Sequence, residues 1–103
     1  MTDLISTAEA EAIIKTHKAP RITEHGIKDK IEKVEYHFLP ETTLTICVIT
    51  MVNGFTVTGE SACALPENFN EEVGKKYAFD DAFKKLWPLE AYLLKERLYL
   101  RYV

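Results

Sequence analysis

Ser61 is the first side chain to consider for chemistry, because it lies in the short segment Gly59–Cys63. The serine elbow Gly-x-Ser-x-Gly needs a second glycine two positions later, where this chain has Cys63. A serine nucleophile would also need His25 or His37 beside it, and no spacing supports that pairing. Cys63 itself is most simply a small buried hydrophobe. These patterns favour a protein without catalytic activity.

Metal ligation is the next chemistry to test, because the chain has two cysteines and three histidines. Zinc sites usually place such ligands two to five residues apart. No Cys-x-x-Cys or His-x-x-x-His spacing occurs here. We therefore expect no metal site and no cofactor.

Basic and aromatic residues offer more. Arg21 precedes the expected helix start at Thr23, where an anion could meet both a guanidinium group and free amides. Further cations and rings alternate toward the C-terminus, a combination that suits stacking and phosphate contact with a nucleotide. The alternative is that the rings form the core and the lysines are solvated. The residues concerned are Lys75, Lys76, Tyr77, Phe83, Lys84, Lys85, Trp87, Tyr92, Arg97, Tyr99 and Arg101.

Two carboxylates complete the candidate set. The strand register derived below places Glu60 on a half-buried face, where a carboxylate needs a partner. Glu90 follows the helix-breaking Pro88 and stands close to Tyr92. We predict one pocket that contains Arg21, Glu60, Lys85, Glu90 and Tyr92. The full set of candidate ligand-binding residues is Arg21, Thr23, Glu60, Lys85, Trp87, Glu90 and Tyr92.

The N-terminal third must position Arg21 and Thr23. A capping box at Ser6 predicts a first helix over Thr7–Thr16. A second short helix starts at Thr23, with Ile27, Ile31 and Val34 on one face. The period then changes to two, which predicts strands over Lys33–Leu39, Leu44–Val52 and Phe55–Ala62.

Asn53-Gly54 predicts the hairpin between the second and third strands. A two-residue loop pairs Val52 with Phe55, and therefore Ile49 with Thr58 and Cys47 with Glu60. In that register Cys47 and Cys63 point to opposite faces, which makes a disulfide between them unfavourable. One sheet face is then apolar and collects Leu44, Ile46, Val48, Val52, Phe55, Val57 and Cys63.

A single long helix is predicted from Asn70 to Leu94, with Asn70 as its cap. Pro88 lacks the amide that would bond to Lys84, so we expect a kink there. The last residues, Leu98 to Val103, could fray, extend the helix or form an edge strand. The apolar positions cover more than one helix face, so Trp87 is an anchor in the core or at a subunit contact.

These elements predict an α+β fold in one domain over residues 1–103. Its parts are two short N-terminal helices, a three-stranded antiparallel meander and a long kinked C-terminal helix packed on the sheet. Apolar residues on both sheet faces need more cover than the chain supplies. We therefore expect a homo-oligomer, a dimer or tetramer by symmetry.

Composition limits the partners. The net charge of −3 argues against binding to duplex DNA. No apolar run has the length of a membrane span, and the N-terminus lacks the features of a signal peptide. We expect an intracellular protein.

Several segments together resemble a family of small tailed-phage proteins named after gene products 49 and 66 of two enterobacterial phages. They are Ala19–Thr23, Asn53–Phe55, Gly59–Cys63, Phe69–Asn70 with Gly74, and Lys85–Leu94. The similarity spans Ser6 to Leu94, and Ala91 departs from it where we expect glycine. The resemblance implies a phage or prophage origin, an action in the host cytoplasm, and no particular mechanism.

Three functions follow as hypotheses. The first is a non-enzymatic phage accessory protein that binds a small anionic ligand, in its concrete form a counter-defence sponge for a nucleotide immune signal of the host. The second is an inhibitor or modulator of a host enzyme that uses Trp87, Tyr92 and Leu93 as anchors. The third is an accessory protein of virion assembly.

Overall fold

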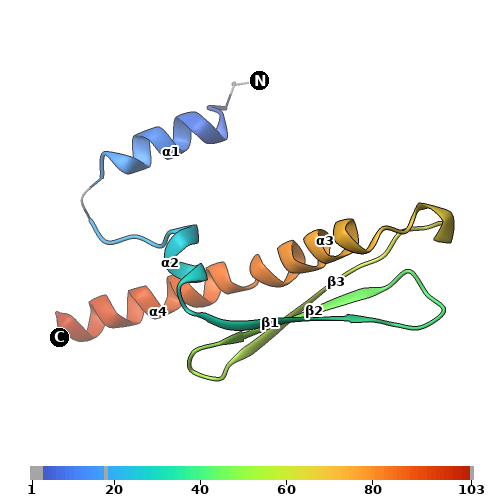
Figure 1. Cartoon of the computed structure of the whole chain (residues 1–103). Coiled ribbons are helices and arrows are strands. Elements are labelled where there is room, and N and C mark those ends of the chain that lie inside the picture. Colours follow the sequence, from blue (N-terminus) through green and yellow to red (C-terminus); the bar gives the residue numbers. More distant parts are fainter. Residues whose placement is uncertain (1–3, 18, 103) are drawn as a thin grey trace.

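The computed structural model describes residues 4–17 and 19–102 and confirms the α+β prediction (Figure 1). Met1 to Asp3, on which the expectation about a signal peptide rests, and Val103 lie outside the described residues. None of the helices among the described residues is both long enough and apolar enough to cross a membrane. In chain order the elements are α1 (Thr7–Lys15), α2 (Glu24–Lys28), β1 (Ile31–Phe38), β2 (Thr45–Met51), β3 (Thr56–Ser61), the 3₁₀ turn η1 (Pro66–Asn68), α3 (Glu71–Phe83) and α4 (Leu86–Arg101).

The helix starts follow the capping residues. Ser6 accepts a hydrogen bond from the Glu9 amide while the Glu9 side chain accepts one from the Ser6 amide, so the predicted capping box is present. Asn70 caps α3 through the Val73 amide. The second helix ends at Lys28, so the prediction that Ile31 and Val34 lie on its apolar face is wrong. Both belong to β1, because the alternating pattern that begins near Lys33 extends back to Ile31 as a strand.

The hairpin register differs from the prediction by one residue. Thr45 pairs with Ser61, Cys47 with Gly59 and Ile49 with Val57. The Gly54 amide donates to the Met51 carbonyl, and Gly54 has a φ of 90°. The loop therefore has three residues, a turn followed by a glycine in the left-handed region, and not two.

Because of this shift, each β2 side chain shares its face of the sheet with a different set of β3 side chains than predicted. Cys47, Ile49 and Met51 are buried together with Val57, whereas Val52 and Phe55, predicted on the apolar face, are exposed. Glu60 lies opposite Ile46 on the outer face and is exposed, so the prediction of a half-buried Glu60 opposite Cys47 is wrong. Both cysteines are free thiols, as expected, although the argument from opposite faces fails in this register.

α3 packs on β2 and β3 through small residues. Ala78 and Ala82 are fully buried, and Gly59 of β3 lies against their backbone. A Cβ atom added to Gly59 would lie 2.1 Å from the Ala82 nitrogen. The helix backbone therefore rests directly on the strand, and this close contact fixes the position of α3 on the sheet.

The C-terminal helix is bent, as predicted, but the break precedes the proline. α3 ends at Phe83 and α4 begins at Leu86, nearly end to end with it (Figure 1). Pro88 cannot donate to the Lys84 carbonyl and its ring clashes with that group, so the helix loosens one turn earlier. The helix then continues to Arg101, beyond the predicted end at Leu94.

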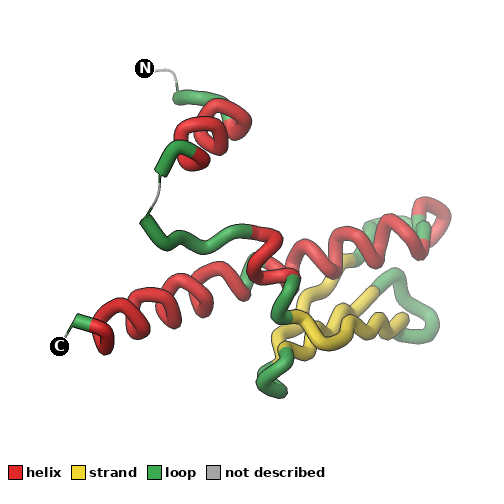
Figure 2. Tube along the Cα trace, turned by 60° about the vertical axis from the view of Figure 1, so that its left-hand side comes forward, coloured by secondary structure: helices red, strands yellow, loops and turns green. Residues whose placement is uncertain are grey.

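α1 stands apart from the rest of the chain in both Figure 1 and Figure 2, and it contributes no buried residue. α2 and α4 join the core through Ile27 and Leu86, each 1% exposed. These two contacts bring the start of the second helix beside the last helix and so create the groove described next.

Candidate functional site

Two adjacent hollows lie between α2, the β2–β3 turn and α4, and they share Lys30, Glu90 and Arg97. We call them together the Glu90 groove. Its polar end has a volume of about 200 Å³ and is lined by the shared residues together with Arg21, Ile22, Thr23, Gly26, Ile27 and Leu94. Its apolar end has a volume of about 380 Å³ and is lined by the shared residues together with Met51, Val52, Asn53, Phe55, Leu86, Leu89, Tyr92 and Leu93.

An ion pair joins the two ends. The Lys30 ammonium donates to a Glu90 carboxylate oxygen, and the Glu90 side chain is only 13% exposed. A carboxylate so shielded needs its counter-charge. The cationic partner of Glu90 is Lys30, and neither Arg21 nor Lys85 forms an ion pair with it.

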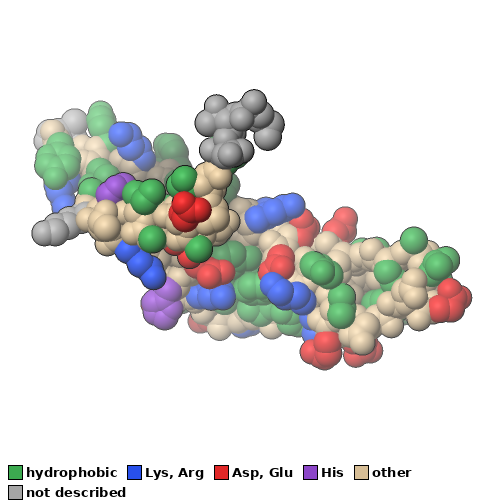
Figure 3. Space-filling model, turned by 90° about the horizontal axis from the view of Figure 1, so that it is seen from above, with side chains coloured by type: hydrophobic (Ala, Val, Ile, Leu, Met, Phe, Trp, Pro, Cys, Tyr) green, Lys and Arg blue, Asp and Glu red, His purple; other side chains and the backbone are tan. Residues whose placement is uncertain are grey.

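Two arginines give the groove a positive balance. Arg21 and Arg97 line its polar end, and within the described part of the chain neither has a carboxylate within 4.0 Å. Since Lys30 neutralises Glu90, the charges of both guanidinium groups remain available. Figure 3 shows acidic and basic side chains interspersed over the view from above, so this balance is local.

Rings with exposed faces stand at the apolar end. Tyr92 of α4 is 71% exposed and Phe55 of the β2–β3 turn is 53% exposed. Leu86, Leu89 and Leu93 supply an apolar floor. A planar ring could stack on such side chains while a charged group reaches the arginines.

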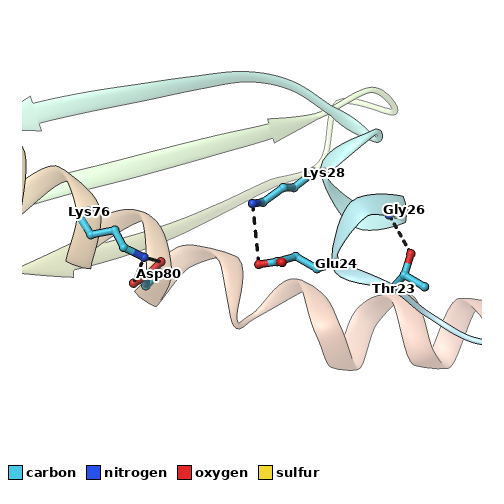
Figure 4. A network of polar contacts seen from close by, with 6 residues as sticks. All are labelled: Thr23, Glu24, Gly26, Lys28, Lys76 and Asp80. Atoms are coloured by element: carbon cyan, nitrogen blue, oxygen red, sulfur yellow. Dashed lines mark hydrogen bonds and ion pairs between the residues drawn. The ribbon is translucent and has the colours of Figure 1, made fainter. Parts of the chain in front are cut away.

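Thr23 lines the groove, but its hydroxyl already takes part in a hydrogen bond within the chain. Its Oγ1 accepts a hydrogen bond of 2.9 Å from the Gly26 amide (Figure 4). Glu24 and Lys28 form an ion pair along the same helix, 3.7 Å between Oε1 and Nζ (Figure 4). The predicted role of Thr23 as a helix cap is confirmed, and the cap occupies one of the amides that an anion would have used.

Glu60, Lys85 and Trp87 line neither hollow. Lys85 donates through Nζ to the Thr58 carbonyl at 2.6 Å, and Trp87 packs edge-on against Phe83 with 6.5 Å between ring centres. The prediction of one pocket for the five residues is therefore wrong: Arg21 and Tyr92 line the two different ends of the groove, Glu90 lines both, and Glu60 and Lys85 line neither. The register of the hairpin turns Glu60 to the outer face, and the strand also places it five residues from Phe55, the β2–β3 turn residue that lines the groove.

Asp81 accepts a hydrogen bond from the Glu60 amide. Among the described residues, it is the one carboxylate whose pKa is clearly shifted. The hydrogen bond from Lys84, followed by the Glu60 amide, lowers the pKa of Asp81 below its usual range. The carboxylate thus stays ionised at the edge of β3.

Lys30 is the charged groove residue that the sequence prediction missed, whereas Arg97 was among the candidate cations but not in the predicted ligand-binding set. Glu90 and Arg97 are seven residues apart, which puts them on one helix face, and that spacing was the available signal. Lys30 had no local signal, because its contact with Glu90 depends on how α2 sits against α4.

The side chains of the two candidate nucleophiles donate hydrogen bonds to backbone carbonyls of the fold. The Ser61 hydroxyl donates to the Gly74 carbonyl at 2.7 Å, and the Cys63 thiol donates to the Leu65 carbonyl at 3.2 Å. Burial raises the pKa of the Cys47 thiol, which keeps it in the unreactive neutral form. Among the described residues, no three His, Cys, Asp or Glu side chains gather closely enough to hold a metal ion.

Comparison with known proteins gives one result. The model of the Phage protein (N4 Gp49/phage Sf6 gene 66) family matches residues 22–98, which contain the whole sheet and every residue of the Glu90 groove except Arg21. No curated protein and no solved structure shows significant similarity to the chain. The matched segment is well over half of the sequence, so the chain belongs to the Phage protein (N4 Gp49/phage Sf6 gene 66) family.

Proposed function

We propose that this phage-family protein is a non-catalytic accessory protein that binds a small anionic ligand in the Glu90 groove. The observation that carries the proposal is a pair of arginines, Arg21 and Arg97, beside an apolar hollow with exposed rings. Neither arginine forms an ion pair with a carboxylate of the described residues. Guanidinium groups bind phosphate in a bidentate manner, and rings bind bases by stacking. A nucleotide combines both chemistries.

The dimensions support a ligand of that class. Small-molecule sites usually have volumes of about 300–1,000 Å³. The apolar end alone offers about 380 Å³, and the polar end adds about 200 Å³. A ring system would fit the apolar end, and a phosphate would fit the polar end beside the two arginines.

The concrete form of this proposal is a counter-defence sponge that acts in the bacterial cytoplasm and sequesters a nucleotide immune signal of the host. A sponge needs affinity and no chemical step, which agrees with the structural contacts of Ser61 and Cys63. Membership of a phage protein family supports a role during infection.

Titration calorimetry with cyclic dinucleotides and cyclic ADP-ribose isomers tests the proposal. We expect binding by one member of the panel and a loss of about tenfold or more in affinity for Arg97→Gln and for Arg21→Gln, because each removes a charge-assisted contact. Arg101→Gln is the matched control, since Arg101 lies on α4 and lines neither hollow. Absence of binding across the panel would contradict the proposal.

A host protein is the second candidate partner, favoured by the exposed apolar side chains of α4. They are Trp87, Leu89, Tyr92, Tyr99 and Leu100. Affinity capture from host lysate separates the two functions: a stoichiometric host protein favours an inhibitor or modulator, whereas a co-purifying nucleotide favours the sponge. Presence of the chain in purified virions would favour a role in virion assembly instead.

A further inference from the structure

The two edges of the sheet differ in how their backbone groups are used. On the β3 edge, the Glu60 amide donates to Asp81 Oδ2 at 2.9 Å, and the Thr58 carbonyl accepts from Lys85 Nζ at 2.6 Å. Unpaired groups at a sheet edge form a template for another strand. Side chains from α3 and the turn after it thus occupy two of the outward backbone groups of β3.

The β1 edge has no such cover. The Leu39 amide donates to the Leu44 carbonyl, and bonded pairs alternate along an antiparallel ladder. It follows that Val34, Tyr36 and Phe38 direct their N–H and C=O groups away from β2. No described residue forms a hydrogen bond with these groups.

We propose that β1 pairs antiparallel with β1 of a second copy of this chain, with Tyr36 on the two-fold axis. In this register Tyr36 faces Tyr36 of the second copy, and Val34 faces its Phe38. Every outward N–H and C=O group of these three residues then gains a partner. The product is a continuous sheet with both α3 helices on the same face.

Charge and regularity disfavour two of the alternative registers. Pairing centred on Glu35 places that carboxylate opposite itself, which is unfavourable. Pairing centred on Val34 runs into the register irregularity between Ile31 and Lys33. Pairing centred on Tyr36 places Glu35 opposite His37 twice, and it uses only the regular part of β1.

Packing points to the same arrangement. α3 packs on β2 and β3, so the α3 side of β1 is less covered. Val34 and Tyr36 are half-buried there, and Phe38 is 36% exposed. A second β1 strand would place apolar side chains against these three and bury them further.

Sedimentation and amide exchange test the dimer directly. We expect a particle of twice the 11.8 kDa chain mass, with slow exchange at the amides of Val34, Tyr36 and Phe38. A monomer at all concentrations, or a dimer in which these three amides exchange rapidly, would overturn the proposal. Neither measurement involves a nucleotide, so the result is independent of the Glu90 groove.

A charge exchange tests the register. His37→Glu places carboxylates opposite Glu35 at two symmetric positions, and we expect roughly tenfold weaker dimerisation. Adding Glu35→Lys to that variant should restore the dimer. Thr56→Glu is the matched control, because it adds a carboxylate to the same sheet face at the other edge. Equal effects of His37→Glu and Thr56→Glu, or no rescue, would refute the proposed register.

Discussion

At the scale of single residues, two hydroxyl groups on the helix-covered face of the sheet have different surroundings. Thr45 and Ser61 are paired across β2 and β3. Ser61 donates to the Gly74 carbonyl, whereas Thr45 Oγ1 is fully buried and has no hydrogen-bond partner among the described residues. A buried hydroxyl without a partner costs free energy that an apolar group of the same shape does not.

Thr45→Val should therefore raise the free energy of unfolding by about 1 kcal/mol, because it exchanges the unpaired hydroxyl for a methyl group. Urea denaturation measures this change. Ser61→Ala is the comparison and should lower the same quantity by about 1 kcal/mol, since it removes a satisfied bond. A lower stability for Thr45→Val would show that the hydroxyl has a partner in solution.

Single residues also explain what the sequence could and could not predict at the site. Three of the five residues predicted for one pocket do line the Glu90 groove, namely Arg21, Glu90 and Tyr92. They could be predicted because cations, carboxylates and rings near helix ends can be recognised in a sequence. Lys30 could not be predicted as a site residue from the sequence. Its ion pair with Glu90 joins residues 60 positions apart and depends on how α2 is oriented against α4.

At the scale of elements, the sequence predicted the order of the α-helices and strands, with α3 and α4 as one kinked helix, but it predicted neither η1 nor how the elements fit together. Asn53-Gly54 identifies a hairpin, yet loops of two and of three residues both use this dipeptide. A one-residue difference reverses the facing of a whole strand, and that error placed Glu60 beside Cys47. The helix break was likewise predicted at Pro88, although the proline acts on the turn before it.

The contact of Gly59 with α3 is the element-scale feature most sensitive to change. Gly59→Ala should lower the free energy of unfolding by about 3 kcal/mol, because the new methyl group would displace the backbone of α3. Thermal and urea unfolding measure the loss. Gly54→Ala is the control, with open space around it and only a cost of about 1 kcal/mol for its positive φ. Equal losses in the two variants would contradict this account.

At the scale of the whole molecule, the chain is extended for its length. Its radius of gyration is 17.5 Å, whereas a compact chain of this size has about 13 Å. α1 accounts for part of the difference because it buries nothing. The family match also begins after α1, at residue 22. The family match thus covers the sheet with α2, α3 and most of α4.

A chain shortened to begin at Ala19 should unfold at nearly the same temperature as the full chain, with a free energy within about 0.5 kcal/mol of it. The physical reason is that α1 has no buried side chain to lose. Calorimetry provides the comparison. A marked loss of stability would reveal that α1 packs on another surface in solution, such as a second copy.

The side chains at the β3 edge have one more consequence, which concerns how large an assembly can become. A sheet with two open edges can add chains without end and form a filament. Asp81 and Lys85 hold two of the outward backbone groups of β3, so a strand that added at that edge would have to displace both side chains. Occupation of these groups therefore disfavours growth of a filament through the β3 side of the sheet.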